Sequence, residues 1–517
     1  MSNKTHNSMI KRATVMRMLS AVAVCVSFFK ESVSAYYFGT GVESDALTLA
    51  MDMPLVLFTF LSAAIAAVVV PIYSEEKILR GERAAQYFFS NFATFTALLC
   101  VLITAAGEIF AGSIVRFFGP GLSPEVRDTT LQLFRWTLPA IALTILGKIS
   151  TAVLNCHKIF CRPAMAPIFY NLFFAACLFA GARRFGIYAA RIGMVAGLGL
   201  EFIYRVALRR RIVRYTPVMD RKHGATRRAV RMSLPVILGM AVSEVNLLVD
   251  KMVASFLTAG NITALNYASK ISSGISTLLI SGISEVIFPE FSERVAEGND
   301  EKTGQLYLSA IRAFLLLLLP ILAGGSFLRQ DIVSLLYARG QFDAASVSMT
   351  SPLFAIYLFS ILFSAIRDVS TKLLYAYGNT RAAMINSSIG VAVNIGLDLL
   401  LVKFLGAVGL ALATTVSAAL VSLLLIRSIR KRVSAVRFDG FGLFIGKLLL
   451  ACLLMVLLLW GITKGWSVAA ASASTALLAR LVISIASGAA AYFLCLHLLK
   501  VEEMRFLVGK LRLRSKG

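Results

Sequence analysis

The sequence predicts an all-α polytopic membrane protein, with about fourteen transmembrane helices arranged as two six-helix lobes and two further C-terminal helices. Three observations predict this class. Of the 517 residues, 58% are apolar and only 15% are charged, whereas a soluble chain needs roughly a quarter of its residues charged. Long uninterrupted apolar runs exclude a membrane β-barrel, whose strands alternate at every second residue. A polar motif of the first half also recurs in the second half.

Apolar stretches long enough to cross a bilayer define the individual spans. Fourteen helices of about 22 residues would use about 308 residues and leave loops averaging about 15 residues. Hydropathy places the spans near 14–38, 46–70, 84–107, 128–155, 164–182, 186–207, 233–257, 262–288, 306–328, 347–376, 382–404, 408–427, 440–462 and 475–499.

Lysine and arginine are concentrated in alternate loops, which predicts the orientation of the chain. Nine basic residues and a single acid, Asp220, occur between Arg209 and Arg231. Because basic loops stay in the cytoplasm, both termini of this multi-pass protein are predicted to be cytoplasmic. Arg183 and Arg184, in a predicted outside turn, depart from the rule. The formal charge of +25 therefore indicates topology and does not indicate binding to nucleic acid.

An internal repeat is the most informative feature of the sequence. The motif VPIYSE at 70–75 recurs as FPEFSE at 288–293, 218 residues further on, and Phe38 and Phe256 match at the same offset. Because the copies are separated by six spans, they have the same orientation across the membrane. The lobes are therefore predicted to be parallel, related by a pseudo-two-fold axis along the membrane normal, with a cavity of alternating access between them.

The repeat and the hydropathy together predict the domain organisation. The segments are an N-lobe at 1–207, a basic cytoplasmic linker at 208–232, a C-lobe at 233–428, a basic cytoplasmic loop at 429–439, the last two spans at 440–499 and a basic cytoplasmic tail at 500–517.

Charged residues inside the predicted spans are candidates for function, because each costs about 2.5–3.5 kcal/mol at the centre of a bilayer. The main candidates for lining a central cavity are Lys30, Glu31, Asp45, Asp52, Asp250, Lys251 and Lys270. A second tier consists of Glu244, Arg367, Asp368, Lys372 and Asp398.

Two interpretations of these charges stay open. The offset of 218 superposes Asp52 on Lys270, which predicts an acid and a base on facing walls of one cavity. The alternative is that adjacent residues such as Lys30 and Glu31 form structural pairs, or that lysines reach the membrane interface.

Catalysis and metal binding find little support in the sequence. The four histidines lie near loops or chain ends, at positions 6, 157, 223 and 497, and a phosphate-binding loop is missing. Cys156, His157 and Cys161 lack the further ligands of a zinc site, and the seven cysteines are too scattered for a disulfide framework. We therefore expect a transporter without cofactor or metal, driven by an ion gradient or the membrane potential, or passive.

Several segments carry a family resemblance. They are FFKESVSAYYFGTGVESDALTLAMDMP, VDKMVASFLTAGNITALNYASKI, VIFPEFSE, DIVSLLYARGQFDAASVSMTSPLFAIYLFS, LLYAYGNTR and LGAVGLALATTVSAAL. These segments resemble the MviN/MurJ family of lipid II flippases, within the multidrug/oligosaccharidyl-lipid/polysaccharide exporter superfamily. The resemblance extends from about residue 12 to about residue 430.

The resemblance implies a fold, a substrate and a place in the cell. It implies fourteen spans, of which the last two, within 440–499, form a hydrophobic groove for a lipid tail. It implies outward movement of an undecaprenyl-diphosphate-linked peptidoglycan precursor across the bacterial inner membrane, through a basic cavity that receives the diphosphate and sugars. The expected partners are this substrate and membrane lipids, and the expected oligomeric state is a monomer.

The chain departs from the family pattern mainly in the first lobe. Lys30 and Glu31 replace an Arg-Asp pair, Lys270 replaces an arginine, and Asp52 replaces a basic residue. A further arginine has become Phe58 or Thr59. Lipid II is the expected substrate; another undecaprenyl-linked glycan, a drug or cation (favoured by Asp52 and Asp398) and a role as an inactive scaffold are the alternatives.

Overall fold

The computed structural model describes residues 2–433, 435–466 and 474–501. All regular secondary structure in these ranges is helical, in seventeen helices, which confirms the predicted all-α class. The chain divides into two compact units. Unit 1 comprises Met1–Thr263 and Arg339–Asp343, and unit 2 comprises the remainder.

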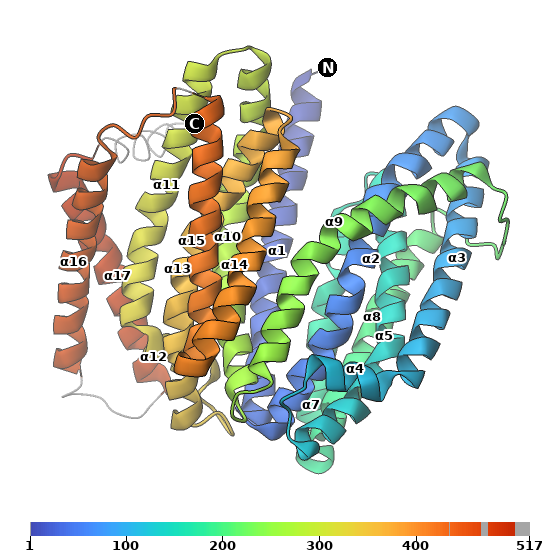
Figure 1. Ribbon diagram of the computed structural model, residues 1–517, viewed down its shortest axis with the longest axis horizontal. Helices are drawn as coiled ribbons and strands as arrows, with labels where there is room; N and C mark the ends of the chain where they lie inside the picture. Colours follow the sequence, from blue (N-terminus) through green and yellow to red (C-terminus); the bar gives the residue numbers. More distant parts are fainter. Residues whose placement is uncertain (1, 434, 467–473, 502–517) are drawn as a thin grey trace. The chain divides into compact units, whose positions relative to one another are not determined.

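Unit 1 contains the first nine helices (Figure 1). They are α1 (Ser2–Phe38), α2 (Val42–Arg80), α3 (Glu82–Ile109), α4 (Ala111–Phe118), α5 (Pro124–Cys156), α6 (Cys161–Ala164), α7 (Ala166–Phe185), α8 (Ile187–Arg210) and α9 (Gly224–Ala254). Helix α2 packs most extensively against α5, and α5 in turn packs against α8. Helix α9 lies along α2, so it belongs to unit 1. The predicted lobe boundary, which precedes this helix, stays a prediction.

Unit 2 contains the remaining helices, except that the first three residues of α10, 261–263, belong to unit 1. They are α10 (Asn261–Ala296), α11 (Asp300–Phe327), α12 (Arg329–Tyr337), α13 (Ala344–Ala376), α14 (Thr380–Leu405), α15 (Ala407–Arg432), α16 (Phe441–Trp466) and α17 (Ser474–Leu498). Helix α13 packs against both α11 and α15, and the pair α16–α17 packs against α11. Asn299 and Asn379 begin α11 and α14 as N-caps, each accepting a hydrogen bond from a backbone N–H three residues on.

Helix bounds repeat along the chain as the sequence motif does. Helices α3 and α11 both have 28 residues and are offset by 218 positions at each end. The turns α7–α8 and α14–α15 each contain one glycine with positive φ, Gly186 (+52°) and Gly406 (+55°). These two glycines are 220 positions apart. The two extra residues lie between the start of α12 and the start of α13.

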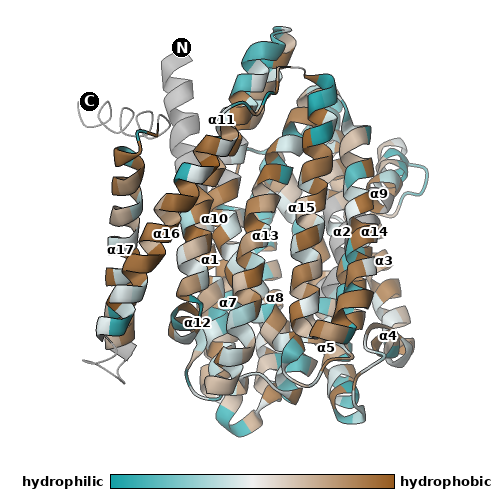
Figure 2. Cartoon of the chain, turned by 60° about the vertical axis from the view of Figure 1, so that its left-hand side comes forward, coloured by the Kyte–Doolittle hydropathy of each residue, from teal (hydrophilic) through white to brown (hydrophobic). Residues whose placement is uncertain are grey.

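Among the described residues, eleven helices are long and apolar enough to cross a membrane. In Figure 2 apolar residues run along almost the whole of α16. The other three predicted spans fall on α2, α9 and α10. Part of the side chains of these three helices lies outside the described residues, and the number fourteen stays a prediction.

Candidate functional site

Lys30 and Glu31 form a buried ion pair on α1 in unit 1. Lys30 Nζ lies 2.9 Å from Glu31 Oε1, and their side chains are 8% and 9% exposed. The ammonium also lies over the rings of Tyr170 and Phe174, which are one turn apart on α7, at 5.8 and 5.3 Å from the ring centroids. Ring faces attract cations, so the packing of α1 on α7 holds this lysine in place without neutralising its charge further.

Asp52 and Lys251 form a second ion pair in unit 1, between α2 and α9. Lys251 Nζ donates to Asp52 Oδ2 at 2.6 Å, and the side chains are 14% and 23% exposed for Lys251 and Asp52 respectively. Both groups therefore remain partly accessible. The neighbouring Asp250 is half-buried. Lys270 lies in unit 2, where it is exposed, so the predicted juxtaposition of Asp52 with Lys270 stays a prediction.

Asp45 has a different environment from the other candidates. Its side chain is buried, and the carboxylate accepts hydrogen bonds from Gly260 N (2.6 Å), Thr263 N (2.8 Å) and Thr263 Oγ1 (2.6 Å). These donors stand at the first turn of α10, where backbone N–H groups lack partners within the helix. Asp45 thus acts as a cap that ties the start of α2 to the start of α10.

The second-tier candidates lie in different environments. Asp368 and Lys372 form an i,i+4 pair on α13 at 3.1 Å, while Arg367 is exposed. Asp398 on α14 is completely buried. The side chain of Glu244 lies outside the part of the chain that the structure describes.

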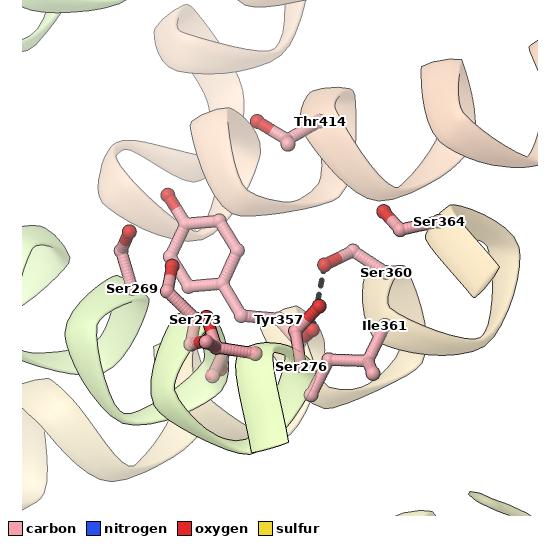
Figure 3. Close-up of a pocket in the computed structure, with 10 residues that line it drawn as sticks. Ser269, Ser273, Ser276, Tyr357, Ser360, Ile361, Ser364 and Thr414 are labelled. Atoms are coloured by element: carbon pink, nitrogen blue, oxygen red, sulfur yellow. Dashed lines mark hydrogen bonds between the residues drawn. The ribbon is translucent and has the colours of Figure 1, made fainter. Parts of the chain in front are cut away.

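A pocket lined by hydroxyl groups lies inside unit 2 (Figure 3). Its volume is about 290 Å³, and helices α10, α13 and α15 form its walls. Tyr357 projects its ring across the pocket between these helices, and Ser360 donates to the Tyr357 carbonyl at 2.6 Å. The remaining lining residues are Ser269, Ser272, Ser273, Ser276, Thr277, Ile361, Ser364 and Thr414.

Sequence reasoning missed this pocket because it searched for charge. The signal was nevertheless present. Ser269, Ser272, Ser273 and Ser276 follow the i, i+3, i+4, i+7 pattern of one helix face, and such a polar face is unusual inside an apolar span. Lys270 is carried by the same helix, one residue from this stripe.

A second pocket of unit 2 is apolar and lies where α16 and α17 meet the core helices. Its volume is about 300 Å³, and its lining includes Pro320, Leu358, Met455 and Gly488. Tyr492 of α17 donates its hydroxyl to the Leu316 carbonyl of α11 at 2.9 Å. An ion pair between Arg480 and Asp331 joins α17 to α12. The last two helices are therefore fixed to unit 2 beside an apolar cavity.

These features suit binding of an amphipathic molecule. Partly accessible lysines can attract phosphate, hydroxyls can hydrogen-bond sugars, and an apolar pocket can take a hydrocarbon chain. In the described ranges no group of three His, Cys, Asp or Glu side chains could hold a metal ion.

A family model and the similar curated proteins agree on one family. The family model described as lipid II flippase MurJ matches residues 34–497. A probable lipid II flippase MurJ from Rickettsia prowazekii is 24% identical over 463 residues, covering 87% of this chain and 90% of the relative. The lipid II flippase MurJ of Burkholderia cenocepacia is 25% identical over 415 residues, covering 78% and 80%.

Solved structures share the fold. A lipid II flippase MurJ in an inward closed conformation superposes with a TM-score of 0.80 at 23% identity, covering 94% of this chain and all of that one. An inward-facing multidrug resistance MATE family transporter gives a TM-score of 0.65 at 15% identity, covering 82% and 96%.

Proposed function

The chain belongs to the lipid II flippase MurJ family, and on this premise we propose that it moves lipid II from the cytoplasmic to the outer leaflet of a bacterial inner membrane. It is a transporter and not an enzyme. The observation that carries the proposal is the family match over residues 34–497, supported by an all-helical fold in two compact units. Alternating access between the units, with both termini in the cytoplasm, is part of the same proposal.

Three kinds of surface supply the chemistry that a lipid-linked substrate needs. Lys251 and Lys270, and Lys30 from its buried pair with Glu31, supply positive charge for the diphosphate. They act as point charges in place of bidentate guanidinium groups. The hydroxyl-lined pocket of unit 2 suits sugar hydroxyls, and the apolar pocket beside α16 and α17 suits part of the polyisoprenyl chain. We further propose that the chain acts as a monomer, with no cofactor, and uses the membrane potential or an ion gradient.

The cation-antiporter alternative is weakened by the Asp52–Lys251 pair. A cation site at Asp52 would need this carboxylate to exchange its lysine partner, which lies 2.6 Å away, for the transported cation. The buried carboxylate of Asp398 is the remaining feature that favours a cation site. Another undecaprenyl-linked glycan remains the closest alternative to lipid II, because the diphosphate and polyisoprenyl chemistry is the same.

The experiment is a transport assay in vesicles containing the purified full chain and a lipid II analogue labelled on its headgroup. We expect Lys270→Gln to slow transfer by roughly ten- to a hundred-fold, since a hydrogen bond to a charged group contributes about 1.5–3 kcal/mol. Lys30→Gln should do the same. Lys30→Gln alone leaves Glu31 as a buried charge without its lysine partner, so it is tested together with Glu31→Gln. A separate variant, Lys30→Arg, keeps the positive charge and should transfer lipid II at the rate of the unchanged protein. Asp52→Asn should preserve or raise it.

Lys403→Gln is the matched control, since Lys403 is exposed on α14 outside all three surfaces. The proposal is contradicted if Asp52→Asn abolishes transport while both lysine variants remain active. That pattern would indicate a site for a cation or proton.

A further inference from the structure

The α7–α8 turn lies at the end of unit 1 opposite the α8–α9 linker (Figure 1). Arginine and aromatic side chains cluster near this turn. Arg183 and Arg184 are exposed in the last turn of α7, and Arg191 follows in the second turn of α8, after the tight turn at Gly186. Since α8 rises about 1.5 Å per residue, Arg191 is about 6 Å deeper along the helix than its start. Three arginines thus lie at the end of the unit where the positive-inside rule disfavours them.

Arg191 is held between two aromatic rings. Its guanidinium carbon lies 4.3 Å from the ring centroid of Trp136 on α5 and 4.7 Å from that of Tyr188 on its own helix. Both rings are about half exposed, at 51% and 47%. Tryptophan and tyrosine are enriched at membrane interfaces, where their apolar part faces lipid and their polar edge faces headgroups.

Among the described residues, the Nε atom of the Arg191 guanidinium is buried without a hydrogen-bond acceptor. No carboxylate in the described ranges lies within salt-bridge distance of this guanidinium. The nearby Arg135, next to Trp136 in sequence, is 3.8 Å from Glu108. The two rings contact the faces of the guanidinium by cation–π interaction but accept no hydrogen bond from its N–H groups. These N–H groups can donate to the oxygen atoms of a phosphate.

We propose that Arg191, Trp136 and Tyr188 form a binding site for the phosphate of an anionic phospholipid headgroup, in the leaflet opposite the basic linker, with Arg183 and Arg184 adding to the attraction. The recognised chemistry is a lipid phosphodiester with net negative charge. This site is separate from the surfaces assigned to transport, because none of its residues lines the pockets of unit 2 or contacts the Lys30–Glu31 and Asp52–Lys251 pairs. It would hold unit 1 against the leaflet.

Trp136 itself provides the readout. The chain has three tryptophans, and Trp460→Phe with Trp466→Phe leaves Trp136 alone. In this variant of the full chain, reconstituted in bilayers, quenching of Trp136 fluorescence by brominated phosphatidylglycerol is compared with quenching by brominated phosphatidylcholine. We expect the anionic lipid to be preferred roughly five-fold, since an arginine near a membrane surface contributes about 1 kcal/mol with anionic lipid.

Arg191→Gln should remove this preference, whereas Arg329→Gln, which removes an exposed charge from α12 in unit 2, should leave it unchanged. Millimolar inorganic phosphate should not compete with the lipid. Equal quenching by both lipids, or a preference equally reduced by both substitutions, would overturn the proposal. Loss of the preference on adding inorganic phosphate would show a site for free phosphate and would overturn it as well.

Discussion

Individual polar residues in unit 1 fall into those that a substrate can reach and those that hold the fold together. Asp52 and Lys251 are paired but partly accessible, so a diphosphate can compete for the lysine. Asp45, in contrast, is buried with three donors on its carboxylate. Charge inside a membrane therefore does not identify function until the partners of each group are known.

Replacing Asp45 with asparagine tests its structural role. Asparagine keeps one acceptor oxygen and loses the negative charge that the first turn of α10 stabilises, so N–H groups at Gly260 and Thr263 are left poorly satisfied. We expect a loss of about 2 kcal/mol or more in the free energy of unfolding, measured as a lower thermal unfolding midpoint in detergent. Glu43→Gln, at an exposed position two residues earlier, should change stability little. Equal stability of the two variants would exclude the cap.

The environment of His157, at the end of α5, predicts that the stability of the folded chain depends on pH. Its Nδ1 accepts from Lys77 Nζ at 3.2 Å and its Nε2 lies 3.0 Å from Tyr73 Oη. Burial and the charge of Lys77 lower the pKa of His157 from its ordinary value of 6.5, although Glu82 opposes this shift. The neutral ring is thus favoured in the folded chain.

A histidine whose pKa is lowered in the folded state leaves stability at its full value when the pH is above the unfolded-state pKa. Stability is lost as the pH falls from that pKa toward the folded-state pKa. We therefore expect the thermal unfolding midpoint to fall as the pH is lowered from about 7.5 to about 5.5, and His157→Gln to flatten this dependence. An unchanged pH profile in the variant would contradict the assignment.

At the scale of elements, a short segment between α12 and α13 fastens the end of α1. Gln341 N donates to the Tyr36 carbonyl at 2.9 Å. Gly39 has a φ of +56°, and a Cβ there would collide with the carbonyl of Gln341. This strap, residues 339–343, belongs to unit 1 although its neighbours in sequence belong to unit 2. The two residues that interrupt the 218-residue register lie in the same part of the chain.

Gly39→Ala should therefore cost about 1–3 kcal/mol, through both the left-handed backbone and the collision, and should loosen the strap. Gly41→Ala is the matched control, because a Cβ at Gly41 has open space and its φ is not in the left-handed region. Thermal unfolding and protease sensitivity of the strap report the difference. Similar behaviour of the two variants would show that the contact is not needed.

Sequence reasoning succeeded where the signal is local. Apolar length and the 218-residue offset predicted helices whose bounds repeat in α3 and α11. The adjacent Lys30 and Glu31 form the ion pair that one of the two interpretations predicts, while their place in a cavity stays a prediction. The Asp52–Lys251 pair joins residues 199 positions apart. A single sequence does not show how α2 and α9 are aligned against each other, so this pair could not be predicted. The hydroxyl pocket likewise depends on three helices meeting.

At the scale of the whole molecule, we expect this chain to carry lipid II outward with lysines as the cations that meet the diphosphate. The most direct measurement uses cells depleted of their own lipid II flippase, in which this chain is expressed and the lipid II exposed on the outer leaflet is quantified. We expect exposed lipid II and growth to return with this chain, and we expect Lys270→Gln to return much less of both. Absence of exposed lipid II, with the protein present in the membrane in normal amounts, would contradict the account.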